Sequence, residues 1–205
     1  MSLPTFFSSN VSDNLKPFRT FEIIIASVCI TIPIFLRIAD PCTHGFRCSI
    51  SDYAYMDRSY IFGMLLCIAA MLFIFNGAVY FYKHQSFEMM TPGKWYNVVL
   101  GVSLLMVILL PYKEFKYPHY TFASIFFGFN AFVIGFFHQR KYRVISRILA
   151  VATLTSLGLH FAFKKEISLF WGEWLSLIVI GVHFILMADG IISLDLEERE
   201  ANENK

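Results

Sequence analysis

Residues 60–82 read YIFGMLLCIAAMLFIFNGAVYFY, and this stretch decides the fold class. It holds no Asp, Glu, Lys or Arg anywhere along its length. A helix needs about 20 mostly apolar residues to cross the ~30 Å hydrocarbon core of a lipid bilayer. The stretch therefore predicts a helix that spans a membrane.

Five further apolar runs have a similar length and composition. The hydrophobic fraction of 57% and the charged fraction of 16% agree with a membrane protein. We therefore expect an all-α, polytopic membrane protein that forms a six-transmembrane-helix bundle. Residues 1–205 are expected to make a single transmembrane domain with an acidic tail over 193–205. The predicted spans are 21–39, 60–82, 96–112, 120–137, 145–163 and 168–192.

The distribution of charge predicts the location and the orientation of the chain. The net charge of +2 and the lack of a basic stripe indicate no nucleic-acid partner. Lys and Arg number ten on the side of the two termini and seven on the opposite side. The clearest basic cluster is HQRKYRVISR at 138–147. Because short cytoplasmic loops are enriched in Lys and Arg, we expect a multi-pass protein of the cell membrane with both termini cytoplasmic.

Two cysteines lie in the first predicted outside loop. Cys42 and Cys48 flank Gly45 in the sequence PCTHGFRC. In an oxidising compartment they would close a small disulfide loop. Two free thiols, or a metal-binding pair assisted by His44, remain alternative interpretations.

Polar and ionisable residues gather near the predicted outer boundary of the membrane. Such residues are costly at membrane depth unless they are paired or hydrated, so they indicate a functional site. In an antiparallel bundle the outer helix ends lie in one layer, and this predicts a single outward-facing polar pocket. The residues are Asp40, His44, Asp52, Asp57, Arg58, His119, His160 and Glu173.

Helical spacing extends this layer inward as lines of polar residues. At about 100° per residue, positions four, eleven or eighteen apart share one face. We expect these faces to point into the bundle, because lipid cannot satisfy polar groups. Ser, Thr, Asn and His also tie helices together by hydrogen bonds, and that is the alternative interpretation. The pairs are Arg58 with Asn76, His119 with Asn130, and Ser156 with His160, with Thr153 on the last stripe.

Asp52, His119 and Glu173 are the strongest candidates for chemistry, because each lies where apolar sequence meets water beside aromatic residues. His119 could act as a general base that Asp52 or Glu173 orients, with Ser49 or Ser51 as the nucleophile. Ser51 is the preferred nucleophile. Further candidate binding residues are Tyr53, Arg58, His160 and Asn130, although Arg58 could also be an interface anchor.

A divalent metal such as zinc is an alternative role for the same groups. Zinc needs three or four nitrogen, oxygen or sulfur ligands. The ligands here would be Asp52, His119, His160 and Glu173. No closely spaced His pair marks such a site in the sequence, so we assign no metal and no other cofactor.

Three segments carry a resemblance to a known family. They are SISDYAYMDRSYIFGMLLCIAAMLFIFNGAVYF at 49–81, GVSLLMVILLP with PHYTFASIFFGFNAFVIGFF at 101–137, and FWGEWLSLIVIGVHFILMADG at 170–190. In this order they resemble the Frag/DRAM/Sfk-type six-helix membrane proteins and the related bacterial families of unknown function. The resemblance implies a six-helix fold and a role in lipid handling. It places the residues Ser51, Asp52, Tyr53, His119 and Glu173 on the polar positions of the family pattern, whereas the loop cysteines and His183 have no counterpart in it.

The sequence thus favours a protein whose outward-facing pocket binds a lipid headgroup or a similar amphiphile from the membrane, with processing of that ligand as a further hypothesis. One alternative is a transporter or channel with a polar path between spans two, four and five. The other is a non-catalytic membrane partner protein. Whether the protein is an enzyme, and its oligomeric state, stay open at this stage.

Overall fold

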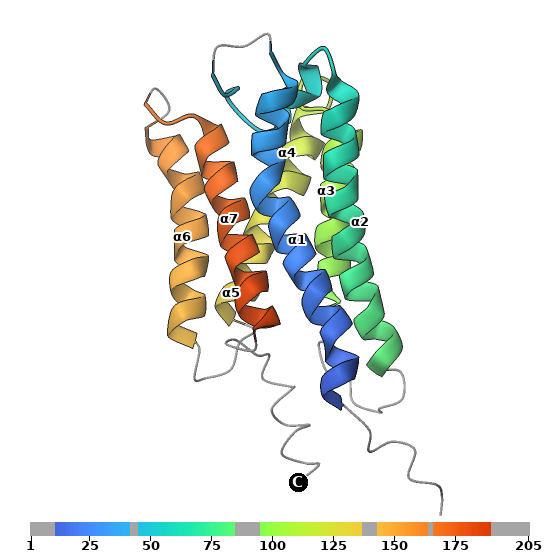
Figure 1. The fold of residues 1–205 in the computed structure, drawn as a ribbon. Helices are drawn as coiled ribbons and strands as arrows, with labels where there is room; N and C mark the ends of the chain where they lie inside the picture. Colours follow the sequence, from blue (N-terminus) through green and yellow to red (C-terminus); the bar gives the residue numbers. More distant parts are fainter. Residues whose placement is uncertain (1–10, 42–44, 85–94, 137–142, 164–165, 190–205) are drawn as a thin grey trace, which may run out of the picture.

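The computed structural model describes residues 11–41, 45–84, 95–136, 143–163 and 166–189, and all regular structure within them is helical (Figure 1). α1 packs against α7 and α2, α2 packs against α3, and α6 lies against both α5 and α7. The elements are α1 (Val11–Ala39), the 3-10 turn η1 (Ser51–Tyr55), α2 (Ser59–His84), α3 (Tyr96–Leu109), α4 (Lys116–Ser124), the π-helical segment η2 (Ile125–Phe129), α5 (Asn130–Phe136), α6 (Arg143–Ala162) and α7 (Leu169–Ala188).

Four helices are long and apolar enough to cross a membrane, which supports a membrane protein. The α4–η2–α5 segments run on without a break and count as one of the four. α3 is apolar but has only 14 residues, or about 21 Å at 1.5 Å per residue. α6, which corresponds to the predicted span 145–163, has 20 residues but is not among the four either. The predicted number of six spans is therefore not established. The four spans are Arg19–Ala39, Ser59–Ala78, Lys116–Phe136 and Leu169–Ala188.

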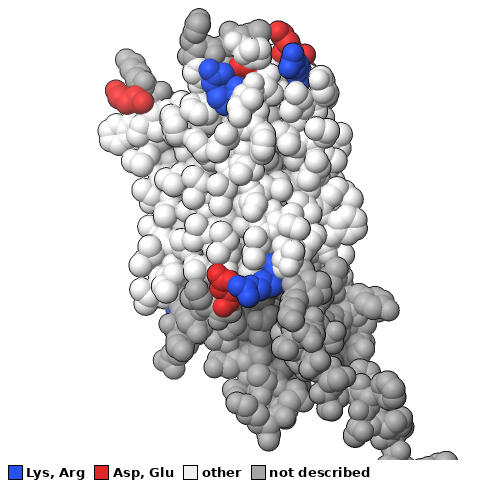
Figure 2. All heavy atoms as spheres, in the orientation of Figure 1, with Lys and Arg blue, Asp and Glu red and all other residues white. Residues whose placement is uncertain are grey.

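The surface agrees with a lipid environment. On the face drawn in Figure 2, charged side chains lie at the two ends of the bundle, and an uncharged band separates them. Large apolar side chains are exposed in this bundle, among them Ile38 at 72% and Phe136 at 67%. Apolar exposure of this kind is unfavourable in water and is expected where lipid tails surround the helices.

Small residues let the helices approach closely. A Cβ atom added at Gly101 of α3 would lie 2.5 Å from the carbonyl oxygen of Ala70 on α2. One added at Gly172 of α7 would lie 2.7 Å from the carbonyl oxygen of Ser156 on α6. Close backbone approach at small residues is a common way to hold helices together in lipid, where hydrophobic burial gives little.

The predicted inward direction of the polar lines is confirmed for their buried members. Asn76, Asn130, Thr153 and Ser156 are each at most 5% exposed. Asn76 accepts a hydrogen bond of 2.6 Å from the side-chain amide of Asn97, which ties α2 to α3. These residues therefore point into the bundle and not into lipid.

The predicted disulfide is not supported. Cys48 is a free, exposed thiol in the structure, and Cys42 lies outside the described residues together with His44. The backbone at Cys48 is held in another way, because its carbonyl oxygen accepts a hydrogen bond of 2.8 Å from the amide of Phe170.

Candidate functional site

A cavity of about 1130 Å³, here called the tip pocket, opens at the end of the bundle where α3 and α6 end and α4 and α7 begin. Its walls come from η1, α4, η2, α6 and the first turns of α7. Ionisable and hydroxyl groups lie among aromatic and aliphatic side chains such as Phe127 and Trp171. The polar groups that matter below are Ser51, Asp52, His119, His160, Glu166 and Glu173.

Ser51 and His119 meet in this pocket. The Oγ atom of Ser51 lies 3.0 Å from Nε2 of His119. The other ring nitrogen, Nδ1, lies 2.7 Å from the carbonyl oxygen of Leu110, which can only accept a hydrogen bond. Nδ1 therefore carries the proton of the neutral ring, and Nε2 presents a lone pair to the serine hydroxyl. This is the geometry of a nucleophile and its general base.

The end of α3 supplies the group that orients the imidazole. Pro111 follows Leu110 directly, and α3 ends at Leu109. The last carbonyl groups of a helix have no partner within the helix. The carbonyl of Leu110 is therefore free to accept the Nδ1 hydrogen bond of His119, a residue that is only 3% exposed. A backbone carbonyl holds the ring, whereas the sequence predicted a carboxylate.

Asp52 holds the turn that carries Ser51. The amide of Ser49 donates to Oδ2 of Asp52 at 3.0 Å, and the amide of Asp52 donates to Oγ of Ser49 at 3.1 Å. This reciprocal exchange is a capping box. The hydroxyl of Tyr112 donates to Oδ1 of Asp52 at 2.6 Å, and this bond raises the pKa of Tyr112 above its ordinary value. Asp52 thus fixes the turn, and its hydrogen bonds go to Ser49 and Tyr112 and not to His119.

Glu173 anchors the same turn from the first part of α7. Its Oε2 atom accepts a hydrogen bond of 2.6 Å from the amide of Ile50, the residue before Ser51. Together with the bond from Phe170 to Cys48, it fastens the chain ahead of η1 to α7. Glu173 is 7% exposed, and its hydrogen bond goes to Ile50 and not to His119.

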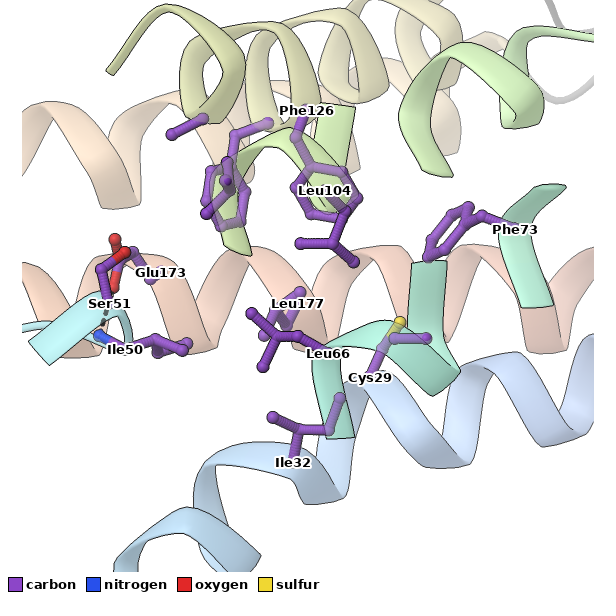
Figure 3. A pocket seen from close by; sticks show the side chains of 14 residues that line it. Cys29, Ile32, Ile50, Ser51, Leu66, Phe73, Leu104, Phe126, Glu173 and Leu177 are labelled. Atoms are coloured by element: carbon purple, nitrogen blue, oxygen red, sulfur yellow. Dashed lines mark hydrogen bonds between the residues drawn. The ribbon is translucent and has the colours of Figure 1, made fainter. Parts of the chain in front are cut away.

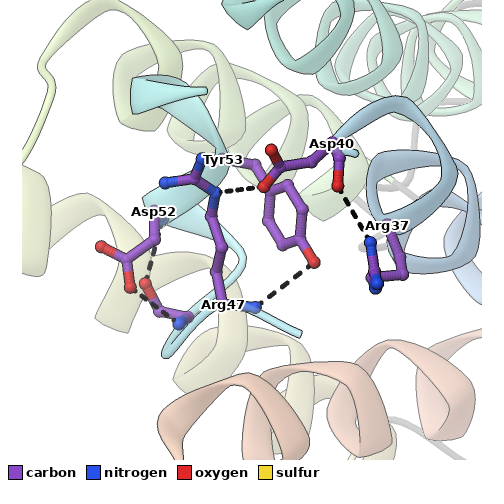
Figure 4. Close-up of polar contacts among 6 residues, drawn as sticks. Arg37, Asp40, Arg47, Asp52 and Tyr53 are labelled. Atoms are coloured by element: carbon purple, nitrogen blue, oxygen red, sulfur yellow. Dashed lines mark hydrogen bonds and ion pairs between the residues drawn. The ribbon is translucent and has the colours of Figure 1, made fainter. Parts of the chain in front are cut away.

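An ionic cluster supports η1 on the side of α1 (Figure 4). Nε of Arg47 lies 2.6 Å from Oδ2 of Asp40, and the guanidinium of Arg37 donates to the Asp40 carbonyl at 2.9 Å. The hydrogen bond to Asp40 raises the pKa of Arg47. The Tyr53 hydroxyl accepts a bond of 3.4 Å from the Arg47 amide, and burial raises the Tyr53 pKa. The cluster keeps the loop against α1.

A second, smaller cavity of about 40 Å³, here called the inner cavity, lies beside the tip pocket (Figure 3). Apart from Ser51 and Glu173, the side chains that line it are apolar or a thiol. Leu66, Leu104 and Phe126 belong to this lining. A space with such walls favours hydrocarbon over water.

The segment η2 shapes one wall of the tip pocket. Five residues, Ile125–Phe129, adopt the π-helical pattern between α4 and α5. Such segments carry an extra residue in the helix and are frequent at functional sites. Phe127 and Gly128 of this segment line the tip pocket, and a Cβ atom at Gly128 would meet nothing within 4 Å.

The other candidate binding residues are placed differently. His160 lines the tip pocket, where Nδ1 lies 2.8 Å from the carbonyl of Ile167. Tyr53 is fully buried, Asn130 is 2% exposed and Arg58 is exposed, and none of these three lines the pocket. The structure therefore brings Ser51, Asp52, His119, His160 and Glu173 to one cavity and leaves the remaining three outside it.

The four proposed metal ligands line one pocket, but they do not form a metal-binding group. Within the described part of the chain, no set of three or more His, Cys, Asp and Glu residues is arranged to hold a metal ion. The oxygens of Asp52 accept hydrogen bonds from Ser49 and Tyr112, and Oε2 of Glu173 accepts one from the amide of Ile50.

Sequence reasoning missed the groups that orient the site. The spacing Ser49-x-x-Asp52 is a capping-box signal, and it would have identified Asp52 as a structural residue. Tyr112 and the Leu110 carbonyl carried only an indirect signal, in Pro111 as the stop of α3. Lys116 and Glu166 line the tip pocket as well, and no pattern in the sequence pointed to them.

The fold and the site define a class: an all-helical membrane protein whose bundle holds a polar pocket with a serine–histidine pair at one end. Residues 31–188 match the DUF7103 family, a family of unknown function, and the chain belongs to this family. No curated protein and no solved structure matches the chain. The resemblance to the Frag/DRAM/Sfk-type proteins is therefore not supported.

Proposed function

We propose that the tip pocket binds the polar headgroup of a membrane lipid or a similar amphiphile, and that Ser51 and His119 act on this ligand as nucleophile and general base. The bond of 3.0 Å between Ser51 and His119, inside an open cavity at the end of a membrane bundle, carries the proposal. The ligand would enter from the bilayer surface with its headgroup in the pocket.

The character of the pocket supports binding of an amphiphile. Ligand sites are usually apolar cavities with a few placed polar groups and volumes of about 300–1,000 Å³. At about 1130 Å³ the tip pocket is slightly larger. Its apolar walls, including Leu157, Leu169 and Trp171, suit the first chain carbons of an amphiphile, whereas Glu166 and Lys116 suit a polar head.

The chemistry follows from the orientation of the imidazole. Because Nδ1 of His119 donates to Leu110, Nε2 is free to take the hydroxyl proton of Ser51. General-base catalysis needs this proton path at hydrogen-bond distance, about 2.6–3.2 Å. The Ser51 oxygen would then attack an electrophilic carbon or phosphorus atom of the bound amphiphile.

The proposed setting is the cell membrane, with six spans, both termini cytoplasmic and the tip pocket on the outer side. The greater number of Lys and Arg residues on the side of the termini supports this orientation. The short helix α3 would span with the help of residues that flank it. A polar transport path is less well supported, because Phe73, Leu104 and Phe126 line the inner cavity next to the tip pocket.

Binding can be tested with a photoreactive phosphatidylcholine in bilayer nanodiscs that contain the full-length protein. We expect cross-links to peptides of α4 and α7 in the wild type. Gly128→Phe should fill the pocket and reduce cross-linking, whereas Gly63→Phe is the matched control. A Cβ atom added at either glycine would meet nothing within 4 Å, but only Gly128 lines the pocket. Equal cross-linking of both variants would contradict the binding proposal.

Reactivity can be tested with an alkyl fluorophosphonate, which labels activated serine residues. We expect label on Ser51, identified by peptide mass spectrometry. Ser51→Ala and His119→Ala should both lose it while their helical circular dichroism is unchanged. Label that persists in His119→Ala at the wild-type rate would remove the general base from the proposal.

The orientation can be tested through Cys48, an exposed free thiol that lines the tip pocket. A membrane-impermeant maleimide added to intact cells should label the wild type through this residue and should label Cys48→Ser much less. Labelling that requires lysis would place the pocket on the inner side.

A further inference from the structure

Ser51 stands at the boundary between two spaces of opposite character. It lines the tip pocket together with charged groups, and it lines the inner cavity together with aliphatic side chains (Figure 3). Glu173, Ala123 and Phe127 also line both spaces. An amphiphile with its reacting atom at the Ser51 oxygen would therefore have a polar part on one side and an apolar part on the other.

We infer that the inner cavity is an acyl-chain subsite, and that the substrate class is an ester of a short-chain acid with an amphiphilic alcohol. This inference rests on the proposed function and names its substrate. The carbonyl carbon would lie at Oγ of Ser51, the acyl chain would enter the inner cavity, and the alcohol would occupy the tip pocket.

The apolar lining decides which end of the ester enters the inner cavity. Cys29, Leu66 and Leu104 are each at most 8% exposed and line this space. Small apolar cavities stay dry and accept hydrocarbon. A phosphate headgroup would lose its hydration there without a counter-charge, because the one ionisable group in the described lining, apart from the Cys29 thiol, is the carboxyl of Glu173, and this cost excludes it.

The size of the inner cavity decides the length of the chain. Its volume of about 40 Å³ is far below the ~300–1,000 Å³ of ordinary ligand pockets. This leaves room for a short acyl chain only. A longer acyl chain would require Leu104, Phe126 or Leu177 to move out of the packed core.

The chemical step uses only groups at the boundary and water. The Ser51 oxygen forms a bond to the carbonyl carbon, and His119 Nε2 takes the hydroxyl proton. The bond from the carbonyl carbon to the alcohol oxygen breaks, and the alcohol leaves with that proton. Water then enters from the tip pocket, gives a proton to Nε2 and forms a bond to the acyl carbon. The Ser51–acyl bond breaks, Ser51 regains its proton from His119, and the short-chain acid is released.

The test compares three fluorophosphonates with the same ethoxy group and with methyl, propyl or octyl chains on phosphorus, applied to the full-length protein in detergent. Labelling forms a bond between Ser51 oxygen and phosphorus and releases fluoride with the hydroxyl proton. The propyl probe should label Ser51 fastest. The octyl probe should be slower by at least about tenfold, the usual effect of a chain that a pocket cannot hold.

Enlarging the cavity should change this preference. Leu104→Ala removes a side chain of the inner cavity and should raise the rate of octyl labelling relative to propyl by about tenfold. Leu100→Ala is the matched control, because Leu100 is a fully buried leucine one turn away on α3 that lines neither cavity. It should keep the wild-type preference.

Two results separate the inference from the proposed function. If Ser51 reacts with all three probes at one rate, and Leu104→Ala behaves like Leu100→Ala, then the acyl-chain subsite is wrong while the nucleophile stands. If no probe labels Ser51 in folded protein, then the proposed chemistry is wrong and the substrate class falls with it.

Discussion

Buried polar groups are hydrogen-bonded to different extents at the tip of the bundle and between α2 and α3. At the tip, the functional groups of Asp52, His119 and Glu173 each bond a defined partner. In the pair Asn76–Asn97, one amide bond is made, but Nδ2 of Asn76 and Oδ1 of Asn97 have no partner among the described residues. The tip is ordered through several hydrogen bonds. In the Asn76–Asn97 pair, only two of the four side-chain amide groups take part in a hydrogen bond with a described residue.

The difference separates a site from a tie between helices. Functional groups must be held in one geometry by surrounding hydrogen bonds, and the tip meets this requirement. An amide pair inside a membrane bundle contributes only about 0.6–1.7 kcal/mol, and it can do so without full satisfaction. We therefore expect mutations at the tip to change both stability and Ser51 reactivity, and mutations of the pair to change stability alone.

The largest effect is expected for Glu173→Leu, which leaves the Ile50 amide without its acceptor. A buried group that loses its partner costs about 1–3 kcal/mol, and Ser51 should shift away from His119. We expect a lower thermal midpoint in detergent and a strong loss of fluorophosphonate labelling. Glu173→Gln keeps an oxygen acceptor and should retain most of both. Equal labelling rates in Glu173→Leu and Glu173→Gln would show that the bond between Glu173 and the Ile50 amide does not position Ser51.

The next largest effect is expected for Asp52→Ala, because it removes the hydrogen-bond acceptor of both Ser49 and Tyr112. Loss of a capping side chain typically costs about 1 kcal/mol. We expect slower labelling of Ser51 with a small decrease in the thermal midpoint. Tyr112→Phe breaks only one of the two bonds and should give a smaller decrease in both. If Tyr112→Phe lowers the labelling rate and the thermal midpoint more than Asp52→Ala does, then the capping box does not hold the turn as proposed.

A smaller effect is expected at the amide pair. Asn76→Leu leaves the Asn97 amide without its acceptor and should lower the free energy of unfolding by about 1 kcal/mol. The double variant with Asn97→Leu removes both polar groups and should recover most of this loss. Ser51 labelling should stay at the wild-type rate in both. Reduced labelling in either variant would mean that the pair and the tip are coupled.

The smallest effect concerns the titration of Tyr112. Its bond to Asp52 raises its pKa above the ordinary value, which is about 10 for tyrosine. The protonated form is favoured in the fold, so its contribution to stability is complete below the ordinary pKa and is lost as the pH rises through the raised one. The tyrosinate absorbance of wild type minus Tyr112→Phe should therefore develop only at strongly alkaline pH. In an Asp52→Ala background, the Tyr112 absorbance should develop at lower pH. If it develops at the same pH as in the wild type, Asp52 is not the cause of the raised pKa.

Much of the fold followed from apolar composition alone. The run 60–82 was expected as a helix and is found within α2, and the run 120–137 corresponds to most of the α4–η2–α5 segments. Composition did not predict that α3 would stop at Leu109, because Pro111 ends a helix at a residue that periodicity does not fix. Composition also did not separate α6, the predicted span 145–163, from the four helices that are long and apolar enough to cross a membrane, so counting apolar runs could not settle the number of spans.

The candidate site was predictable in its members and not in its bonds. The rule that ionisable residues at helix ends converge gave His119, Asp52 and Glu173, which line one pocket with Ser51. Which partner each group takes depends on backbone atoms, such as the carbonyl of Leu110 and the amide of Ile50. These backbone groups carry no side-chain signal, and the sequence could not reveal them.

The π-helical segment Ile125–Phe129 has a consequence for length variation in this chain. It accommodates one surplus residue between His119, at the tip, and Asn130, in the interior. A deletion of one residue within 125–129 would remove the bulge and restore a regular α-helix, and the two flanking halves would keep nearly their present orientation. The imidazole of His119 would stay near Ser51, whereas the pocket wall that Phe127 and Gly128 form would change. Relatives that differ by one residue here would therefore keep the fold and the serine–histidine pair, and they would differ in the shape of the tip pocket.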